Sequence, residues 1–73
     1  MFAIFVVFNE RGYWSKPYTY KSEVSYDIGD VVVVPTGDFF SIGKVVKCIE
    51  NYNNFNPGIN YKHIHSKVEN VKS

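Results

Sequence analysis

The sequence predicts a single small all-β domain, a partly open barrel of five strands that spans residues 1–73. The chain has 73 residues, which is enough for one domain and too few for two. Six Phe, six Tyr and one Trp provide the large side chains from which a small β core is built. The apolar residues fall in short runs between Gly, Pro and Asn turns and show no long 3.6-residue period, which favours strands over helices.

The first strand is predicted over residues 2–8, where nearly every side chain is β-branched or aromatic. We therefore expect it to be buried on most of both faces, with residues 9–12 forming the turn after it. The run is too short to span a bilayer, and it lacks the basic flank and the small-residue cleavage site of a signal peptide. No membrane association is expected.

A second strand is predicted over residues 18–21, where polar and aromatic side chains alternate. The two tyrosines, Tyr18 and Tyr20, point to one face, and Thr19 and Lys21 point to the other. This two-residue period is typical of a strand with one exposed face.

The next segment, residues 22–27, is expected to cross the end of the barrel. It has no sustained period, and either Val24 or Tyr26 is predicted to turn inward. Such a crossing carries the chain to the next strand without pairing of its own.

Four consecutive valines, residues 31–34, predict the most regular strand of the chain, because β-branched side chains are stiff and pack well on a pleated sheet. Gly29 allows a turn at positive φ before this strand, and Asp30 can accept a hydrogen bond from a backbone amide of that turn. Pro35 is expected to terminate pairing. A tight connector at residues 36–38 then returns the chain.

The following strand is predicted over residues 39–49, and Gly43 within it marks a bulge or a sharp bend. An Asn-rich stretch at residues 51–58 then predicts the longest loop, before the last element. That element covers residues 59–68, with Ile64 and Val68 as inward anchors. Their spacing of four fits either a strand or one helical turn.

The strand motifs together resemble a known pattern: an aromatic strand, a Gly-Asp turn, a valine strand followed by proline, and a Gly-x-Val-Val strand. The matching segments are Tyr18–Lys21, Asp27–Pro35, Gly43–Val46, Tyr61–Lys62 and Lys67–Val68. The pattern is similar to the N-terminal DNA-binding domain of the bacterial primosomal replication helicase and to short proteins encoded by bacteriophages. The resemblance implies an SH3-like barrel and a phage source.

Composition excludes some classes of function. Eight Lys plus Arg stand against seven Asp plus Glu, so the chain has no global field that would drive strong binding to phosphate backbones. Cys48 is the single cysteine and cannot form an internal disulfide, which suits a reducing compartment. We expect a cytoplasmic protein, in the host cell if the source is a phage.

Three residues, His63, His65 and Cys48, are candidates for metal binding or catalysis. His63 and His65 would share one face of a strand, but no third metal ligand lies at a suggestive spacing, and a structural zinc ion needs four. Cys48 lies in a strand pattern without an orienting acid, and lone cysteines of this kind are usually small core residues. No metal, no cofactor and no enzymatic activity are therefore expected.

Aromatic residues predict a binding surface, because so small a core cannot enclose all of them. Exposed aromatic rings act as protein hot spots or as stacking platforms for unpaired bases. The alternative is that the loop aromatics only anchor the ends of the barrel. The candidate partner-binding residues, together with neighbouring lysines, are Trp14, Tyr18, Tyr20, Lys21, Lys44, Lys47, Tyr52 and Phe55.

A basic strip beside the tyrosines is a second expectation, since it is the minimum requirement for contact with a single-stranded backbone. It would be formed by Arg11, Lys16, Lys21, Lys44, Lys47 and Lys62. Acidic residues are interleaved with these in the sequence, and a surface of mixed sign is the favoured interpretation.

The function expected from these features is that of a non-catalytic binding protein. It would bind and modulate or inhibit a host or phage protein through loop aromatics and an open strand edge. The alternative is a module that binds single-stranded DNA or takes part in replication. Pairing of the open edge with a second copy would give a homo-oligomer.

Overall fold

The computed structural model describes residues 1–69 of the chain; the last four residues of the predicted domain lie outside this range. The described residues contain strands and no helix, which confirms the all-β prediction. Five strands form one antiparallel sheet and two form a separate hairpin. The strands are β1 Phe2–Val7, β2 Asn9–Glu10, β3 Tyr13–Trp14, β4 Tyr18–Ser22, β5 Val31–Thr36, β6 Phe39–Ile49 and β7 Ser66–Lys67.

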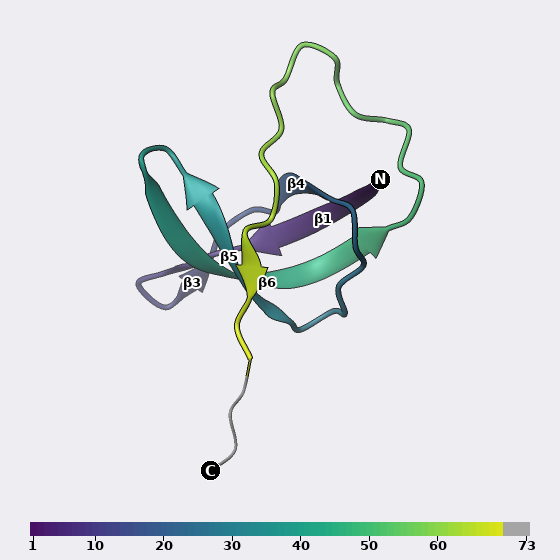
Figure 1. Cartoon of the computed structure of the whole chain (residues 1–73). Coiled ribbons are helices and arrows are strands. Elements are labelled where there is room, and N and C mark those ends of the chain that lie inside the picture. The colour runs from purple at the N-terminus through teal and green to yellow at the C-terminus, as the bar shows by residue number, and fades with distance from the viewer. Residues whose placement is uncertain (70–73) are drawn as a thin grey trace.

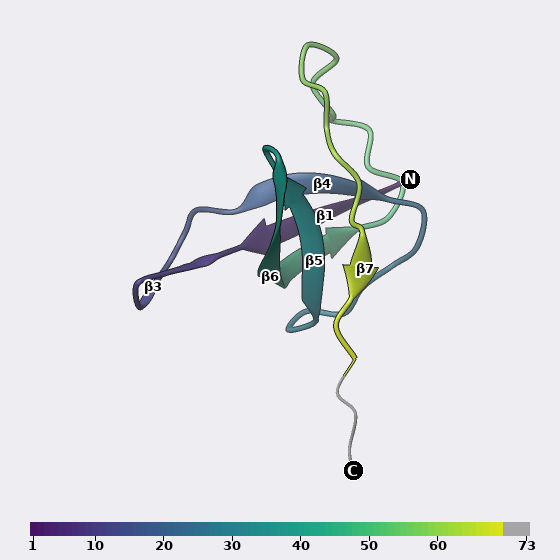
Figure 2. The ribbon, with the colours of Figure 1, turned by 60° about the vertical axis from the view of Figure 1, so that its left-hand side comes forward.

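The large sheet has the order β4-β1-β6-β5-β7 and is strongly curled. Residues 39–44 of β6 pair with β5, and residues 44–49 pair with β1. Because one long strand serves two partners in turn, β6 curves across the molecule (Figure 1), and β5 crosses β1 at a steep angle (Figure 2). The result is a curled five-strand sheet that does not close into a barrel by strand pairing.

Gly43 lies where β6 passes from one partner to the other. It keeps regular register opposite Val32, so of the two predicted alternatives, a bulge or a sharp bend, the bulge is not found at this residue. The register shifts further along, between the pairs Phe5–Lys47 and Val6–Val45. Gly43 is instead required by close packing, since a Cβ atom at this position would overlap the Val6 side chain.

The core lies on the concave side of the sheet. It is centred on β1, whose residues alternate between this core and the opposite face, and the valines of β5 and β6 complete it. Its buried members are Ile4, Val6, Tyr20, Val32, Val34 and Val45. Ala3 and Val7 of β1 are also buried but stand outside this cluster, which confirms that the first strand is buried on most of both faces.

The segment between β4 and β5 packs one aromatic residue inward. Tyr26 contacts the core cluster, whereas Val24 is 57% exposed, which decides between the two candidates. Ser22, just before this segment, is buried, and its hydroxyl donates to the carbonyl of Val24.

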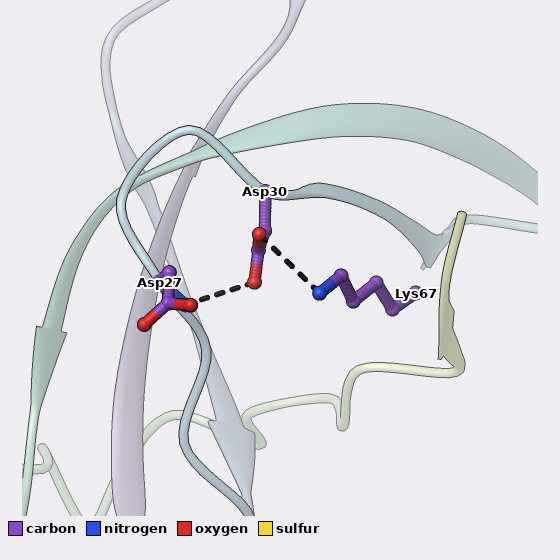
Figure 3. Close-up of polar contacts among 3 residues, drawn as sticks. All are labelled: Asp27, Asp30 and Lys67. Atoms are coloured by element: carbon purple, nitrogen blue, oxygen red, sulfur yellow. Dashed lines mark hydrogen bonds and ion pairs between the residues drawn. The ribbon is translucent and has the colours of Figure 1, made fainter. Parts of the chain in front are cut away.

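The turn before β5 has the predicted chemistry. Gly29 has a φ of 96°, and the amide of Asp27 donates to Oδ2 of Asp30 at 2.9 Å. Oδ1 of the same carboxylate lies 3.5 Å from Nζ of Lys67 in β7, so Asp30 joins the turn to the last strand (Figure 3).

The prediction that Pro35 ends its strand is wrong. β5 continues to Thr36, and Pro35 lies opposite Phe40 in β6. The missing N–H is tolerated because β7 pairs only with Val32 and Val33, so Pro35 lies on an open edge where no ladder bond is lost. Gly37, with a φ of 61°, then begins the two-residue turn into β6 and confirms the tight connector.

The turn predicted at residues 9–12 is present but shorter, because Asn9 and Glu10 of β2 pair with β3 and only Arg11 and Gly12 form the connection of the β2–β3 hairpin. Arg11 and Gly12 both have positive φ, 55° and 90°, which matches the twist that two-residue hairpins favour. The side chain of Asn9 accepts a hydrogen bond from the Gly12 amide at 3.0 Å.

The chain between β6 and β7 is irregular apart from a parallel bridge between Lys21 and His63. Ile64 is partly buried against the core, as predicted. Val68 is 40% exposed, so its prediction as an inward anchor is wrong. The reason is that the Val68 amide donates to the carbonyl of Val31 at 2.8 Å, which places Val68 beside an exposed residue of β5 and not beside the core valines.

Candidate functional site

A seam runs between β4, which is one end strand of the sheet, and β5, whose outer edge is covered only in part by the short end strand β7. The C-terminal segment fills part of this seam, because Lys62 and Ile64 bond to Lys21 in β4 while His65 bonds to Val33 in β5. Past these bonds the Tyr20 hydroxyl of β4 donates a hydrogen bond to the carbonyl of Pro35 in β5 at 3.3 Å. The seam is therefore filled at one end and open at the other.

The open end forms a groove of about 830 Å³, which we call the seam groove. Residues 16–20 form one wall, and residues 35–37 with Ser41 form the other. Residues 59–62 border the groove at the filled end, and Phe8 and Glu10 also line it. The lining combines tyrosine rings, hydroxyl groups and a few charges, which are groups that can orient a bound ligand.

Tyr18 is the most exposed ring of the groove wall. It is 43% exposed, packs at 5.7 Å against the ring of Phe8, and has Nζ of Lys16 5.7 Å from its own ring. Opposite it, the hydroxyls of Thr36 and Ser41 bond to each other at 2.7 Å. Tyr18 is thus a preordered aromatic surface beside a polar wall.

Tyr20, a second predicted partner-binding residue, lies mainly in the core. It is 7% exposed, and it also contributes to the lining of the groove. Burial raises the pKa of its hydroxyl above the ordinary value of 10.0, and the neighbouring Tyr18 adds to the effect.

This raised pKa predicts a loss of stability at alkaline pH. A group whose pKa is higher in the folded state contributes stability below its unfolded pKa, and that contribution disappears as pH rises through the folded value. The free energy of urea unfolding of the native protein should therefore fall as the pH rises through and above about 10, more steeply than that of Tyr20→Phe. Equal pH slopes for the two proteins would refute the assignment.

The opposite face of the sheet carries lysines. By register, Lys21 lies opposite Ala3, Lys47 opposite Phe5 and Lys44 opposite Val7, all on the face away from the core. These are the charged residues of the four long strands, none of which contains an acidic residue. We call this surface the lysine face.

Each lysine of this face lies over an aromatic ring. Nζ of Lys44 is 5.3 Å from the Trp14 ring, and Nζ of Lys47 is 5.9 Å from the ring of Phe5. Nζ of Lys21 is 5.0 Å from the Phe55 ring. The mixed-sign surface expected from the sequence thus does not extend to the four long strands, because the acidic residues of the described chain fall in turns, in loops and in the short strand β2.

Tyr52 and Phe55, the loop aromatics, pack within the molecule. Tyr52 meets the ring of Phe5 edge-on at 6.1 Å, Phe55 meets Tyr52 at 4.8 Å, and Tyr61 meets Phe55 at 4.9 Å. All three are half-buried. This stack anchors the long loop, and the rest of the loop projects from the sheet (Figure 1). The arrangement agrees with the alternative interpretation, in which the loop aromatics serve as anchors.

Trp14, by contrast, is 54% exposed on the short hairpin, and its only recorded ring contact among the described residues is Lys44. The structure thus divides the eight candidate residues. Tyr18 and Tyr20 belong to the seam groove, Lys21, Lys44 and Lys47 to the lysine face, Trp14 to its edge, and Tyr52 and Phe55 to the loop stack.

The three candidates for metal binding or catalysis, His63, His65 and Cys48, take part in separate contacts. The ring of His65 packs at 4.9 Å on Phe40, and His63 takes part in the bridge to Lys21. Cys48 is partly buried against the core. Within residues 1–69, no three His, Cys, Asp or Glu side chains gather as a metal site would require.

Several residues of the groove are not among the partner-binding residues predicted from the sequence, notably Lys16, Thr19, Thr36 and Lys62. The sequence predicts Lys16 and Lys62 in one basic strip with the strand lysines, but in the structure these two lysines line the groove. The available signal was Pro35, because a proline inside a strand pattern indicates an edge strand and therefore an open side of the sheet.

No protein-family model, curated protein or solved structure matches this chain. The part of the chain that the structure describes has no helix long and apolar enough to cross a membrane.

Proposed function

We propose that this chain is a non-catalytic binding protein that modulates or inhibits a host or phage protein through the seam groove. The observation that carries the proposal is the open groove itself, with Tyr18 half-exposed and already held by Phe8 and Lys16 on its wall. A rigid aromatic side chain beside hydroxyl groups is typical of binding hot spots, since little entropy is lost when it is covered.

We also propose a finer assignment of the fold, an SH3-like partly open barrel. A sheet that curls around one core, with the C-terminal segment bonded to both β4 and β5, is consistent with an SH3-like partly open barrel that has a long Asn-rich loop before its last element. The resemblance of its strand motifs to short bacteriophage proteins supports a phage source. Action in the host cytoplasm accords with the single free thiol of Cys48.

The proposal is tested by comparing what variants retain from a host lysate. Immobilised native protein and Tyr13→Ala should retain the same protein, whereas Tyr18→Ala should lose it. Tyr13 is the matched control because it is 78% exposed and does not line the groove. Equal retention by the two alanine variants, or recovery of nucleic acid in place of protein, would contradict the proposal.

A second candidate function, binding of single-stranded nucleic acid, is favoured by the lysine face. Lysines placed beside aromatic rings can contact phosphates while a ring such as that of Trp14 stacks on a base. This is the alternative that the resemblance to the helicase domain also suggests.

This alternative predicts that Lys44→Glu and Lys47→Glu each weaken binding to an oligothymidylate strand by tenfold or more. The slope of log affinity against log salt should fall by roughly 0.7 for each lysine removed from a phosphate contact. Lys62→Glu makes the same change of charge on the groove side and should have little effect. Fluorescence anisotropy across a salt series measures all three, and equal losses for all three would refute a localised site.

A further inference from the structure

Backbone groups alternate in direction along β4, and the bonds of Lys21 fix which residues point away from β1. The Lys21 amide donates to the carbonyl of Lys62 at 2.9 Å, and its carbonyl accepts from the amide of Ile64 at 3.1 Å. Both bonds lie on the side of β4 opposite β1. Lys21 is therefore an outward-directed residue of this strand.

Thr19 has the same orientation, because it lies two residues earlier in an uninterrupted antiparallel register with β1. Its N–H and C=O consequently point into the seam groove, which Thr19 lines. Within residues 1–69, no hydrogen bond from the C-terminal segment reaches Thr19, although that segment bonds to Lys21. One donor and one acceptor of a strand edge are thus available in the groove.

The opposite wall cannot receive a strand in the same way. Pro35 occupies the corresponding outward position on β5, two residues after Val33, whose carbonyl bonds to His65. Proline has no N–H to donate, and the Pro35 carbonyl already accepts from the Tyr20 hydroxyl. Strand addition is therefore restricted to the β4 side of the groove.

The charges of the groove favour an acidic ligand. Lys16 and Lys62 line it together with a single carboxylate, Glu10. Nζ of Lys62 is 3.4 Å from the carbonyl of Gly37 on the far wall, so this cation extends across the groove. An extended ligand with an acidic side chain near these lysines would be attracted electrostatically.

We propose that the seam groove binds an extended, acidic segment of the partner protein, which adds to the edge of β4 by pairing with the N–H and C=O of Thr19. Alternate side chains of the segment pack on Tyr18 and on the exposed edge of Tyr20. This inference rests on the proposed function and specifies the form and charge of its ligand.

The test uses peptides selected on the full chain from a displayed library of random linear peptides. Acidic residues should be enriched among them, and a synthetic selected peptide should bind Thr19→Pro about tenfold more weakly than the native protein. Thr19→Val retains the N–H and should bind like the native protein. Proline is tolerated where the N–H of an edge strand faces away from its neighbour, so Thr19→Pro should keep the ladder with β1.

Hydrogen exchange supplies a readout that needs no variant. On peptide binding, exchange of the Thr19 amide should slow markedly, and an unchanged rate would overturn strand addition. Selected peptides that lack acidic enrichment, or that bind Thr19→Pro as tightly as Thr19→Val, would also overturn it. If peptides that contradict strand addition still bound Tyr18→Ala more weakly than the native protein, the proposed function of the groove would stand. If their affinity were also unchanged by Tyr18→Ala, both strand addition and binding through the groove would be refuted.

Discussion

Gly43→Ala is expected to destabilise the fold by roughly 3 kcal/mol, a large part of the stability of a domain of this size. The new Cβ would overlap Cγ1 of Val6, and it would lie 3.1 Å from Cε1 of Phe8 and 3.2 Å from the carbonyl oxygen of Val7. Val6 is fully buried and β-branched, so its side chain has no alternative position to adopt. Urea unfolding followed by circular dichroism measures the loss.

The control for this variant is Gly58→Ala. Gly58 lies in the exposed loop, where a new Cβ would meet only the side chain of Asn56, at 3.3 Å, so a change within about 0.5 kcal/mol is expected. The double variant Gly43→Ala, Val6→Ala should lose less unfolding free energy than the sum of the two single losses, because Val6→Ala removes the methyl group that the new Cβ would overlap. Full additivity would show that the two residues do not meet.

Ile4→Ala is the second change with a large expected effect, about 3 kcal/mol. Ile4 is fully buried at the centre of β1, opposite Tyr20 in β4 and Cys48 in β6. Removing three carbons there leaves a cavity in the layer that joins the three strands, and the surrounding strands can close it only in part. The midpoint of urea unfolding should fall without a change in the slope of the transition.

Ile28→Ala is the matched control, because Ile28 is 74% exposed in the turn before β5. Its unfolding free energy should change by less than about 0.5 kcal/mol. Equal losses at both positions would contradict the placement of the core on the concave side of β1.

The regular strands could be predicted because their signals are local. The valines of β5 and the apolar run of β1 favour extended backbone whatever their neighbours are, and Gly29 and Gly37 mark the turns. The last element was less predictable, because β7 is only two residues long and depends on its contact with β5. Val68 illustrates this, since its exposed position beside Val31 follows from pairing with β5, which no local pattern indicates.

The sites were only partly predictable, because they depend on which strands become neighbours. Tyr18 and Tyr20 share one face of β4, yet only Tyr20 reaches the core. Lys44 and Lys47 are three residues apart, an odd spacing that would place them on opposite faces of a regular strand. The register shift between them turns both to the lysine face, and no local pattern in the sequence indicates that shift.

The measurement that tests the seam groove most directly is site-specific photo-cross-linking in the host lysate. A benzophenone amino acid at position 18, in the groove wall, should cross-link to the partner protein in high yield. The same group at position 24, where Val24 is 57% exposed outside the groove, should not. Cross-links of equal yield from both positions, or from position 24 alone, would contradict binding through the groove.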